Sequence, residues 1–418
     1  MTDYLAFLRR NLRWLVAGFL LTWASSFGQT FFISVFAGEI RAAFGLSHGE
    51  WGGLYAGATM ASAAVMVYAG GLTDRFRVRR IGPVILFGLA LATFLMAMAS
   101  AVWALAVAVF LMRLMGQGMM SHSAMVAMSR WFAAQRGRAV AFAGLGVAAG
   151  EALLPILAAS LLLVLDWRSL WLCAGLLLVA LVPVLNALLR QERTPQSFAA
   201  ESRSAGMRGR QWTRAEVLRH WLFWLLLPAV LGPPAWNTAF FFHQVHLAEV
   251  KGWAHVTLVA LFPVFTLTGI ASMLATGWAV DRFGAARLVP VYLLPLAAGY
   301  LVLSQAATPT TGALAMVLMG LSVGANATLS AALWAEFYGT AHLGRIRAMT
   351  GAVMVLGSAI GPGVTGALID RGYDMTVQSV WIAGYFLLAA ALAGAGALAA
   401  RRALPAPASA LAPEPGPG

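Results

Sequence analysis

Residues 70–80 read GGLTDRFRVRR and stand between two long apolar runs. The stretch GWAVDRFGAAR at residues 277–287 repeats this pattern 207 positions later, with glycine, aspartate, arginine and phenylalanine in register. The same offset relates further pairs: Arg138 and Arg345, Gly150 and Gly357, Pro155 and Pro362. Matches at one offset over about 85 residues indicate two tandem copies of one structural unit.

The composition places the chain in a membrane. Of its 418 residues, 61% are hydrophobic and 10% are charged, whereas soluble domains carry about 25% charged residues. These polar side chains are too few to cover the surface of a water-soluble protein of this length. A soluble protein is therefore excluded. The single cysteine, Cys173, excludes an internal disulfide and a cysteine metal site. We expect neither a metal nor a cofactor.

Twelve apolar runs are each long enough to cross about 30 Å of hydrocarbon. They predict an all-α membrane protein of twelve transmembrane helices, because backbone groups in lipid need internal partners. The repeat divides these helices into two pseudo-symmetric bundles of six. The expected units are an N-terminal bundle at 1–190, a cytoplasmic linker at 191–217, a C-terminal bundle at 218–402 and a disordered Pro-rich tail at 403–418. The first apolar run, residues 12–36, is expected to be one spanning helix.

The net charge of +13 indicates orientation and not nucleic-acid binding. Arginines gather in the segments that would share one side with both termini, whereas the opposite loops hold only Arg41, Arg168, Lys251 and Arg371. Basic residues favour the cytoplasmic side of a membrane. We therefore expect a multi-pass protein of the cell inner membrane with both termini cytoplasmic.

Residues 70–80 resemble the signature loop G-x-x-x-D-R-x-G-R-R of the major facilitator superfamily, with Arg77 where the second glycine is usual. LMRLMGQG at 111–118 resembles the second signature of that family, and residues 131–155 resemble the span-five entry of its monocarboxylate and oxalate/formate porter branch. The resemblance implies the two-bundle fold of that family and transport of a small solute by alternating access.

The resemblance also implies a gate between the bundles at the cytoplasmic side. Its anchors would be Asp74 and Asp281, whose carboxylates can accept hydrogen bonds from helix N-termini and arginines and would favour the outward-facing state. The alternative is that these charges only mark sidedness. The full set of expected gate residues is Asp74, Arg75, Arg138, Asp281, Arg282 and Arg345.

Two ionisable residues are predicted near the middle of the bilayer, where a charge is costly unless it is paired or hydrated. Arg113 lies in the fourth span and Glu151 in the fifth, and their depths allow an ion pair. Arg113 is a candidate for substrate binding and proton coupling, and Glu151 is a candidate proton carrier or permanent counter-ion. The alternative is that Arg113 only braces the two spans.

Spans one, four, seven and ten line the central cavity in the fold that the resemblance implies. Polar or aromatic residues at helical spacing in these spans are therefore expected to bind substrate. Pro233 and Pro234 are expected to interrupt span seven. The aromatic rows either stack on a substrate ring or fill space. The predicted ligands are Ser26, Gln29, Thr30, Arg113, Gln117, Asn237, Phe241, Gln244, Ser322, Asn326 and Ser330.

These features predict a monomeric secondary transporter that moves a small organic anion such as a monocarboxylate, coupled to protons as a symporter. The sequence contains no Walker loop, and no nucleophile elbow or paired carboxylates that would indicate an enzyme. Two alternatives stay open. One is an efflux carrier of amphipathic compounds, which needs a wide apolar cavity, and the other is a transport-inactive membrane sensor or partner-binding protein.

Overall fold

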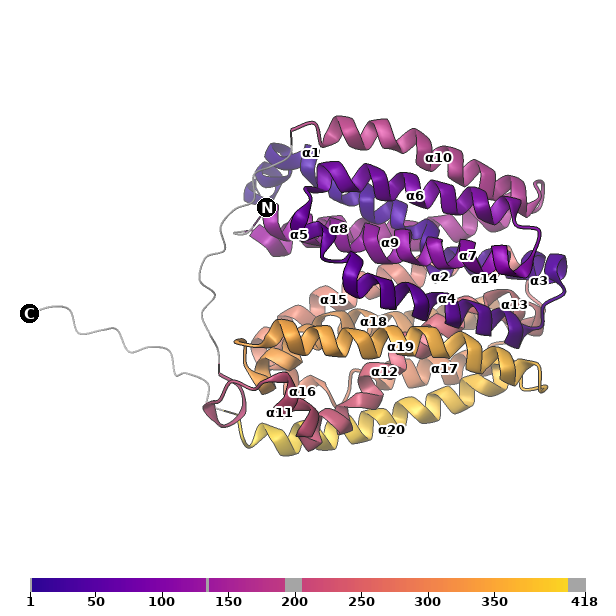
Figure 1. Ribbon diagram of the computed structural model, residues 1–418. Coiled ribbons are helices and arrows are strands. Elements are labelled where there is room, and N and C mark those ends of the chain that lie inside the picture. Colours follow the sequence, from indigo (N-terminus) through magenta and orange to yellow (C-terminus); the bar gives the residue numbers. More distant parts are fainter. Residues whose placement is uncertain (1, 133–134, 192–204, 405–418) are drawn as a thin grey trace, which may run out of the picture.

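The computed structural model describes residues 2–132, 135–191 and 205–404, and these residues form helices and no β-strand. The helices divide into two halves that lie side by side (Figure 1). The N-terminal half comprises α1 (Thr2–Ser25), η1 (Ser26–Gly28), α2 (Thr30–Ile33), η2 (Ser34–Phe36), α3 (Ala37–Phe44), α4 (His48–Ala69), α5 (Leu72–Arg75), α6 (Val78–Met98), α7 (Val102–Met112), η3 (Arg113–Met120), α8 (Ser121–Trp131), α9 (Arg136–Leu161) and α10 (Trp167–Leu188).

The C-terminal half begins after the linker and runs to residue 404. It comprises η5 (Met207–Gly209), α11 (Arg214–Arg219), α12 (Trp221–Phe242), α13 (Gln244–Lys251), α14 (His255–Val259), α15 (Phe262–Phe283), α16 (Ala285–Leu288), α17 (Leu294–Gln305), α18 (Pro309–Tyr338), α19 (Leu343–Ile369) and α20 (Met375–Arg401).

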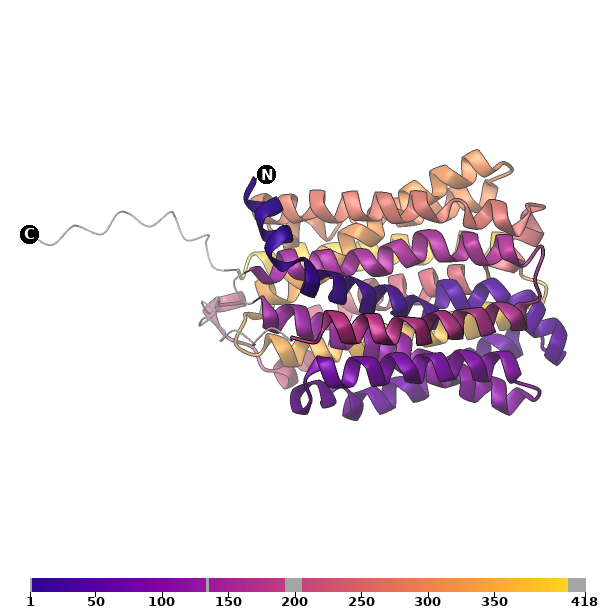
Figure 2. The ribbon, with the colours of Figure 1, turned by 90° about the horizontal axis from the view of Figure 1, so that it is seen from above.

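The long helices of both halves run along one common direction, as two perpendicular views show (Figure 2). The described chain begins and ends at the same end of the molecule, which we call the terminal end. The opposite end, which carries α3 and α13, is the distal end. Within the described residues nine helices are long and apolar enough to cross a membrane, and the bent pair at the N-terminus makes a tenth. The shorter α17 and the less apolar α4 lie among them.

The internal repeat is visible in the helix boundaries. An offset of 207 residues carries α9 onto α19 to within one residue at each end. The same shift carries α10 onto the first part of α20. The all-α architecture of two related bundles is therefore confirmed.

The first apolar run is not one continuous helix. α1 passes into a 3₁₀ turn, and Gln29 adopts an extended conformation with φ −87° and ψ 154° before α2 starts. The two parts meet at an angle of 48°. The prediction of a single helix over residues 12–36 was wrong because composition reports the length of an apolar run but not a break within it.

The predicted interruption of span seven at Pro233 and Pro234 was also wrong, because α12 continues through both residues. Proline has no N–H, so Pro233 leaves the carbonyl oxygen of Ala229 without its helical donor. The hydroxyl of Tyr292 donates to that oxygen at 3.1 Å. A neighbouring helix thus satisfies the freed group, as lipid requires.

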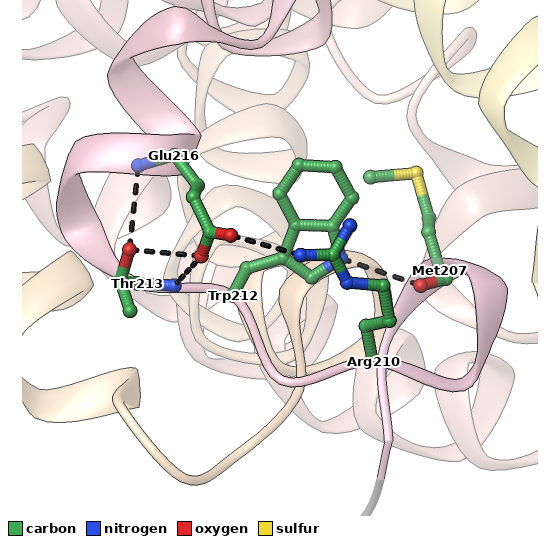
Figure 3. A network of polar contacts seen from close by, with 5 residues as sticks. All are labelled: Met207, Arg210, Trp212, Thr213 and Glu216. Atoms are coloured by element: carbon green, nitrogen blue, oxygen red, sulfur yellow. Dashed lines mark hydrogen bonds and ion pairs between the residues drawn. The ribbon is translucent and has the colours of Figure 1, made fainter.

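The end of the linker folds against the terminal end of the C-terminal half. Glu216 accepts hydrogen bonds from Thr213 and forms an ion pair with Arg210 at 2.9 Å (Figure 3). The indole of Trp212 packs edge-on against Tyr338 of α18. The expected linker boundary at residue 217 falls inside α11, and the remaining linker residues 192–204 and tail residues 405–418 lie outside the described residues.

The two halves touch closely at the distal end, where α4 packs along α19. A Cβ on Gly52 of α4 would overlap the carbonyl oxygen of Pro362 in α19. A Cβ on Gly366 would lie equally close to the carbonyl oxygen of His48. Glycine at these positions allows the backbones to approach, as small residues do between membrane helices.

We predict that Gly52→Val forces the halves apart at the distal end. The adjacent variant Gly53→Val is the control, because a Cβ at Gly53 meets nothing within 4 Å. Spin labels at Ala42→Cys and Tyr373→Cys in a Cys173→Ala background would report the separation by double electron–electron resonance. Equal distance distributions for the two variants would contradict the close packing.

Candidate functional site

A cavity of about 790 Å³ lies between the terminal halves of α4 and α19, with η3 and α8 at its back. Most of its lining is apolar, with methionine, alanine and valine side chains from α4 and α19. The polar part comes mainly from η3 and α8. The polar lining residues are Thr59, Ser62, Arg113, Gln117 and His122.

Arg113 begins η3, a π-helical stretch within the fourth span, and its side chain is 1% exposed. Its Nη1 donates to the carbonyl oxygen of Gly28 at 3.1 Å. That carbonyl precedes the extended residue Gln29, so the break in the first span removes its helical partner. The guanidinium also lies over the ring of Tyr55 at 5.2 Å, a cation–π arrangement.

The other edge of the Arg113 guanidinium has no partner among the described residues. Both Nε and Nη2 are buried without a hydrogen bond. A buried charged donor without an acceptor costs free energy. Nε and Nη2 form one edge of the planar group, which is the edge that holds a carboxylate in a two-point contact. Arg113 therefore contributes to the wall of the cavity and carries a buried edge of positive charge that no described residue satisfies.

Arg113 and Glu151 do not form the ion pair that their depths allow. Glu151 instead accepts a hydrogen bond from the hydroxyl of Thr266 at 2.9 Å. Since Glu151 belongs to α9 and Thr266 to α15, this bond joins the two halves. The depth argument brought both residues to one layer but did not fix the direction in which each side chain points.

A second cavity of about 180 Å³ lies within the C-terminal half, between α12, α18 and α19. Asn326 and Ser330 line it together with the rings of Tyr292 and Trp334. Gly351 borders both this cavity and the large one. Two of the predicted ligands in span ten thus lie beside a pocket next to the main cavity.

Several predicted ligands lie in the distal contact between the halves. Gln244 donates through Nε2 to Phe31 O at 3.1 Å and to Ser34 Oγ at 2.7 Å. Ser34 in turn donates to the carbonyl oxygen of Phe241, which is 207 residues away. These two positions are therefore equivalent in the repeat and meet between the two bundles.

The remaining predicted ligands do not border the two cavities. Thr30 is hydrogen-bonded to Tyr55 at 2.5 Å, and Asn237 accepts from Tyr300 at 3.5 Å. Ser26 and Ser322 are buried with unpartnered hydroxyls. The backbone carbonyl of Gln29 accepts from the start of the second helical piece. Their part in substrate binding stays a prediction.

The predicted gate residues lie at the terminal end, which is open in this structure. Asp281 is exposed and makes no hydrogen bond or ion pair with a described residue. Arg282 lies over the ring of Trp278 at 5.7 Å, and Arg345 lines a surface pocket beside α11. The side chain of Asp74 lies outside the described part of the chain. Arg75 and Arg138 are exposed.

The distal end is closed by a carboxylate that the sequence analysis missed. Asp370, just after α19, accepts from Ser47 Oγ at 2.7 Å and from the N–H groups of His48 and Gly49 at 3.0 and 2.8 Å. Burial opposes the charge, but these donors hold the pKa of Asp370 below its usual range. An aspartate beside a loop gives no periodic signal, so only its place opposite the first turn of α4 reveals it.

The family model of the Major Facilitator Superfamily matches residues 18–316 and 264–417. The chain belongs to the major facilitator superfamily. It is therefore a transporter and not an enzyme.

Solved structures of this superfamily have the same fold. A bacterial homolog to human lysosomal transporter Spinster, inward-facing and unoccupied, has a TM-score of 0.71 at 14% identity and covers 94% of this chain and 98% of that one. The occupied form of that homolog has a TM-score of 0.67 at 17% identity, with coverage of 93% and 96%. A mutant of the nucleoside transporter NupG has a TM-score of 0.64 at 11% identity, with coverage of 93% and 99%.

A shorter stretch is similar to a curated protein. The "Multidrug resistance protein B homolog" of Mycobacterium tuberculosis is 36% identical over 110 residues, which is 25% of this chain. The match spans 20% of the length of that protein. At these identities the solved structures establish the fold of this transporter and leave its solute open.

We predict that Asp370→Asn weakens the distal closure at neutral pH. A depressed pKa means that the ionised carboxylate supports closure above the ordinary aspartate range, near about 4, and that this support is lost as the pH falls through the still lower pKa of the closed state. Loss of the charge-assisted bonds should raise the open-to-closed ratio about tenfold. Spin labels at Ala42→Cys and Tyr373→Cys would measure this ratio at pH 7.5. An unchanged ratio would contradict the role of Asp370 in closing the distal end.

Proposed function

We propose that this protein is a secondary transporter that moves a small organic anion, such as a monocarboxylate, across the cell inner membrane by alternating access. The single observation that carries the proposal is that Arg113 contributes to the wall of the large cavity while its buried Nε–Nη2 edge has no hydrogen-bond partner among the described residues. A carboxylate matches this edge in charge and geometry. The apolar lining from α4 and α19 would hold the rest of the molecule.

The arrangement of contacts supports alternating access. Hydrogen bonds between the halves cluster toward the distal end, at Asp370, Ser34 and Glu151, whereas the large cavity lies in the terminal half. If the positive-inside prediction holds and both termini are cytoplasmic, this state is inward-facing. The anion would then bind or leave from the cytoplasm.

Proton coupling is the second part of the proposal, and it involves Glu151. Its carboxylate lies at the contact of α9 with α15 and accepts from Thr266. Because the bond crosses between the halves, the charge of Glu151 and the separation of the halves influence one another. Arg113 lies within the N-terminal half and would respond to the anion.

Efflux of amphipathic compounds is a second candidate function. The large cavity has a mainly apolar lining. The Mycobacterium tuberculosis protein that is similar over 110 residues is named as a multidrug resistance protein homolog. Such a carrier would bind many apolar compounds with little dependence on Arg113. The two candidates therefore differ in how they respond to loss of this charge.

We predict that a monocarboxylate stabilises the purified protein and that Arg113 is required for it. In a thermal-shift screen of monocarboxylates, amino acids and inorganic anions, a saturating substrate should raise Tm by about 2–5 °C. Arg113→Lys keeps the charge but loses the two-point edge, so the shift should disappear. Arg371→Ala, at an exposed distal position, should keep it. Shifts that persist in Arg113→Lys would favour the efflux alternative.

We predict that Glu151→Gln abolishes uptake driven by a pH gradient in proteoliposomes but leaves solute exchange intact. The amide keeps a hydrogen-bonding group for Thr266 and removes the titration. Glu249→Gln, an exposed carboxylate of α13, is the matched control and should behave as the parent. Gradient-driven uptake that survives in Glu151→Gln would assign proton coupling to another group.

A further inference from the structure

A group of three histidines lies in the distal contact between the halves. His48 starts α4 in the N-terminal half, whereas His243 and His246 belong to the junction of α12 with α13 in the C-terminal half. The ring centroids of His48 and His246 are 4.7 Å apart, and those of His48 and His243 are 6.0 Å apart. We call these residues the distal histidines.

The rings of the distal histidines have few hydrogen-bond partners among the described residues. His243 is 3% exposed, and its Nε2 lies 3.0 Å from the carbonyl oxygen of Pro362. A carbonyl only accepts, so this nitrogen carries the proton. Nε2 of His246 is buried without a partner. The bond to Pro362 can be made by a neutral or a charged ring and favours the charged one, whereas burial seals the Nε2 of His246 from water.

The charges around the distal histidines are mixed. Arg41 of α3 acts on all three rings and opposes a further positive charge. Asp370, after α19, faces His48, and Asp374, before α20, faces His246. Asp370 already accepts three hydrogen bonds from the start of α4. Burial is the largest influence on His246 and lowers its pKa, although Asp374 acts in the opposite sense.

The geometry of the closed contact disfavours protonation of the distal histidines. Two imidazolium rings at van der Waals separation repel one another, and Arg41 adds to the repulsion. When the halves separate, His48 leaves the other two rings, and the ring faces that were in contact become hydrated. An exposed histidine takes up a proton near about pH 6.5. The open state therefore binds protons more tightly than the closed one.

We propose that His48, His243 and His246 form a proton-binding site that is occupied when the distal end opens, so that acid on that side drives it open. The inference rests on the alternating opening in the proposed function and not on the nature of the solute. Among the described residues no group of histidine, cysteine and carboxylate side chains is arranged to hold a metal ion.

The expected size of the effect follows from linkage. A ring that stays neutral when closed and has an ordinary pKa when open shifts the open-to-closed ratio about tenfold between pH 7.5 and pH 5.5. Asp370 does not contribute in this window, because its pKa lies below the usual aspartate range. A response between these two pH values therefore reports the distal histidines, Glu151 or His255, whose Nε2 lies 3.4 Å from Oε1 of Gln244 in the same contact.

The test uses the full chain in lipid nanodiscs without solute, with spin labels at Ala42→Cys and Tyr373→Cys in a Cys173→Ala background. We expect the open fraction at the distal end to rise between pH 7.5 and pH 5.5. The triple variant His48→Gln, His243→Gln, His246→Gln should lose this response. His255→Gln beside the distal contact, His342→Gln at the terminal end and Glu151→Gln should keep it. A parent without a response, or a triple variant that retains it, would overturn the proposal.

A second variant guards against misfolding of the triple variant. His48→Arg places a permanent charge against the two other rings and should be open already at pH 7.5. The exposed-site control Arg371→Ala should stay closed at that pH. A closed His48→Arg would contradict the proposal even if the triple variant does not fold. Because no solute is present, an absent monocarboxylate flux would overturn the proposed function and leave this result standing.

Discussion

The structure depends on the rule that every backbone polar group in lipid needs a partner within the protein. The first span breaks at Gln29, and this break would leave the carbonyl of Gly28 exposed to an apolar environment. Arg113 supplies the missing donor from the neighbouring span. The break and the buried arginine therefore explain one another. The same rule explains why Tyr292 donates to Ala229 beside Pro233.

The two halves are held together unevenly along their length. At the distal end, glycine-mediated packing of α4 on α19 combines with the hydrogen bonds of Asp370 and Gln244. At the terminal end the same two helices border a large cavity. Because packed interfaces switch between discrete arrangements and do not deform continuously, such unevenness suits a protein that alternates between two closures. Each closure can rest on a few hydrogen bonds.

Much of the fold followed from the sequence because lipid imposes strong and simple rules. The lengths of the apolar runs and the 207-residue repeat predicted the two bundles, and α9 and α19 match to within one residue at each end. The break at Gln29 and the continuity of α12 through Pro233 were not predictable from composition. Both depend on partners from other helices, namely Arg113 and Tyr292, that only the packed structure brings near.

The candidate site was predictable in part. Arg113 and Gln117 were expected beside a cavity and lie in its wall, whereas Gln244 and Phe241 lie in the distal contact. Helical spacing gives the face of the helix on which a residue lies but not its height relative to the opening, and closure of the distal end buries part of the expected lining. The role of Asp370 was not predicted because it depends on contact with the first turn of α4, which is distant in the sequence.

The separation of the ionisable groups has a consequence for coupling. Arg113 bonds within the N-terminal half, whereas Glu151 and the distal histidines lie between the halves. A group inside one bundle can change its charge environment when a ligand arrives without moving the bundles. A group between the bundles gains or loses water whenever they rock, so its affinity for protons is tied to the motion itself. Anion recognition and proton linkage can therefore reside in different residues of one transport cycle. The second bundle then needs no charged counterparts of Arg113 and Glu151.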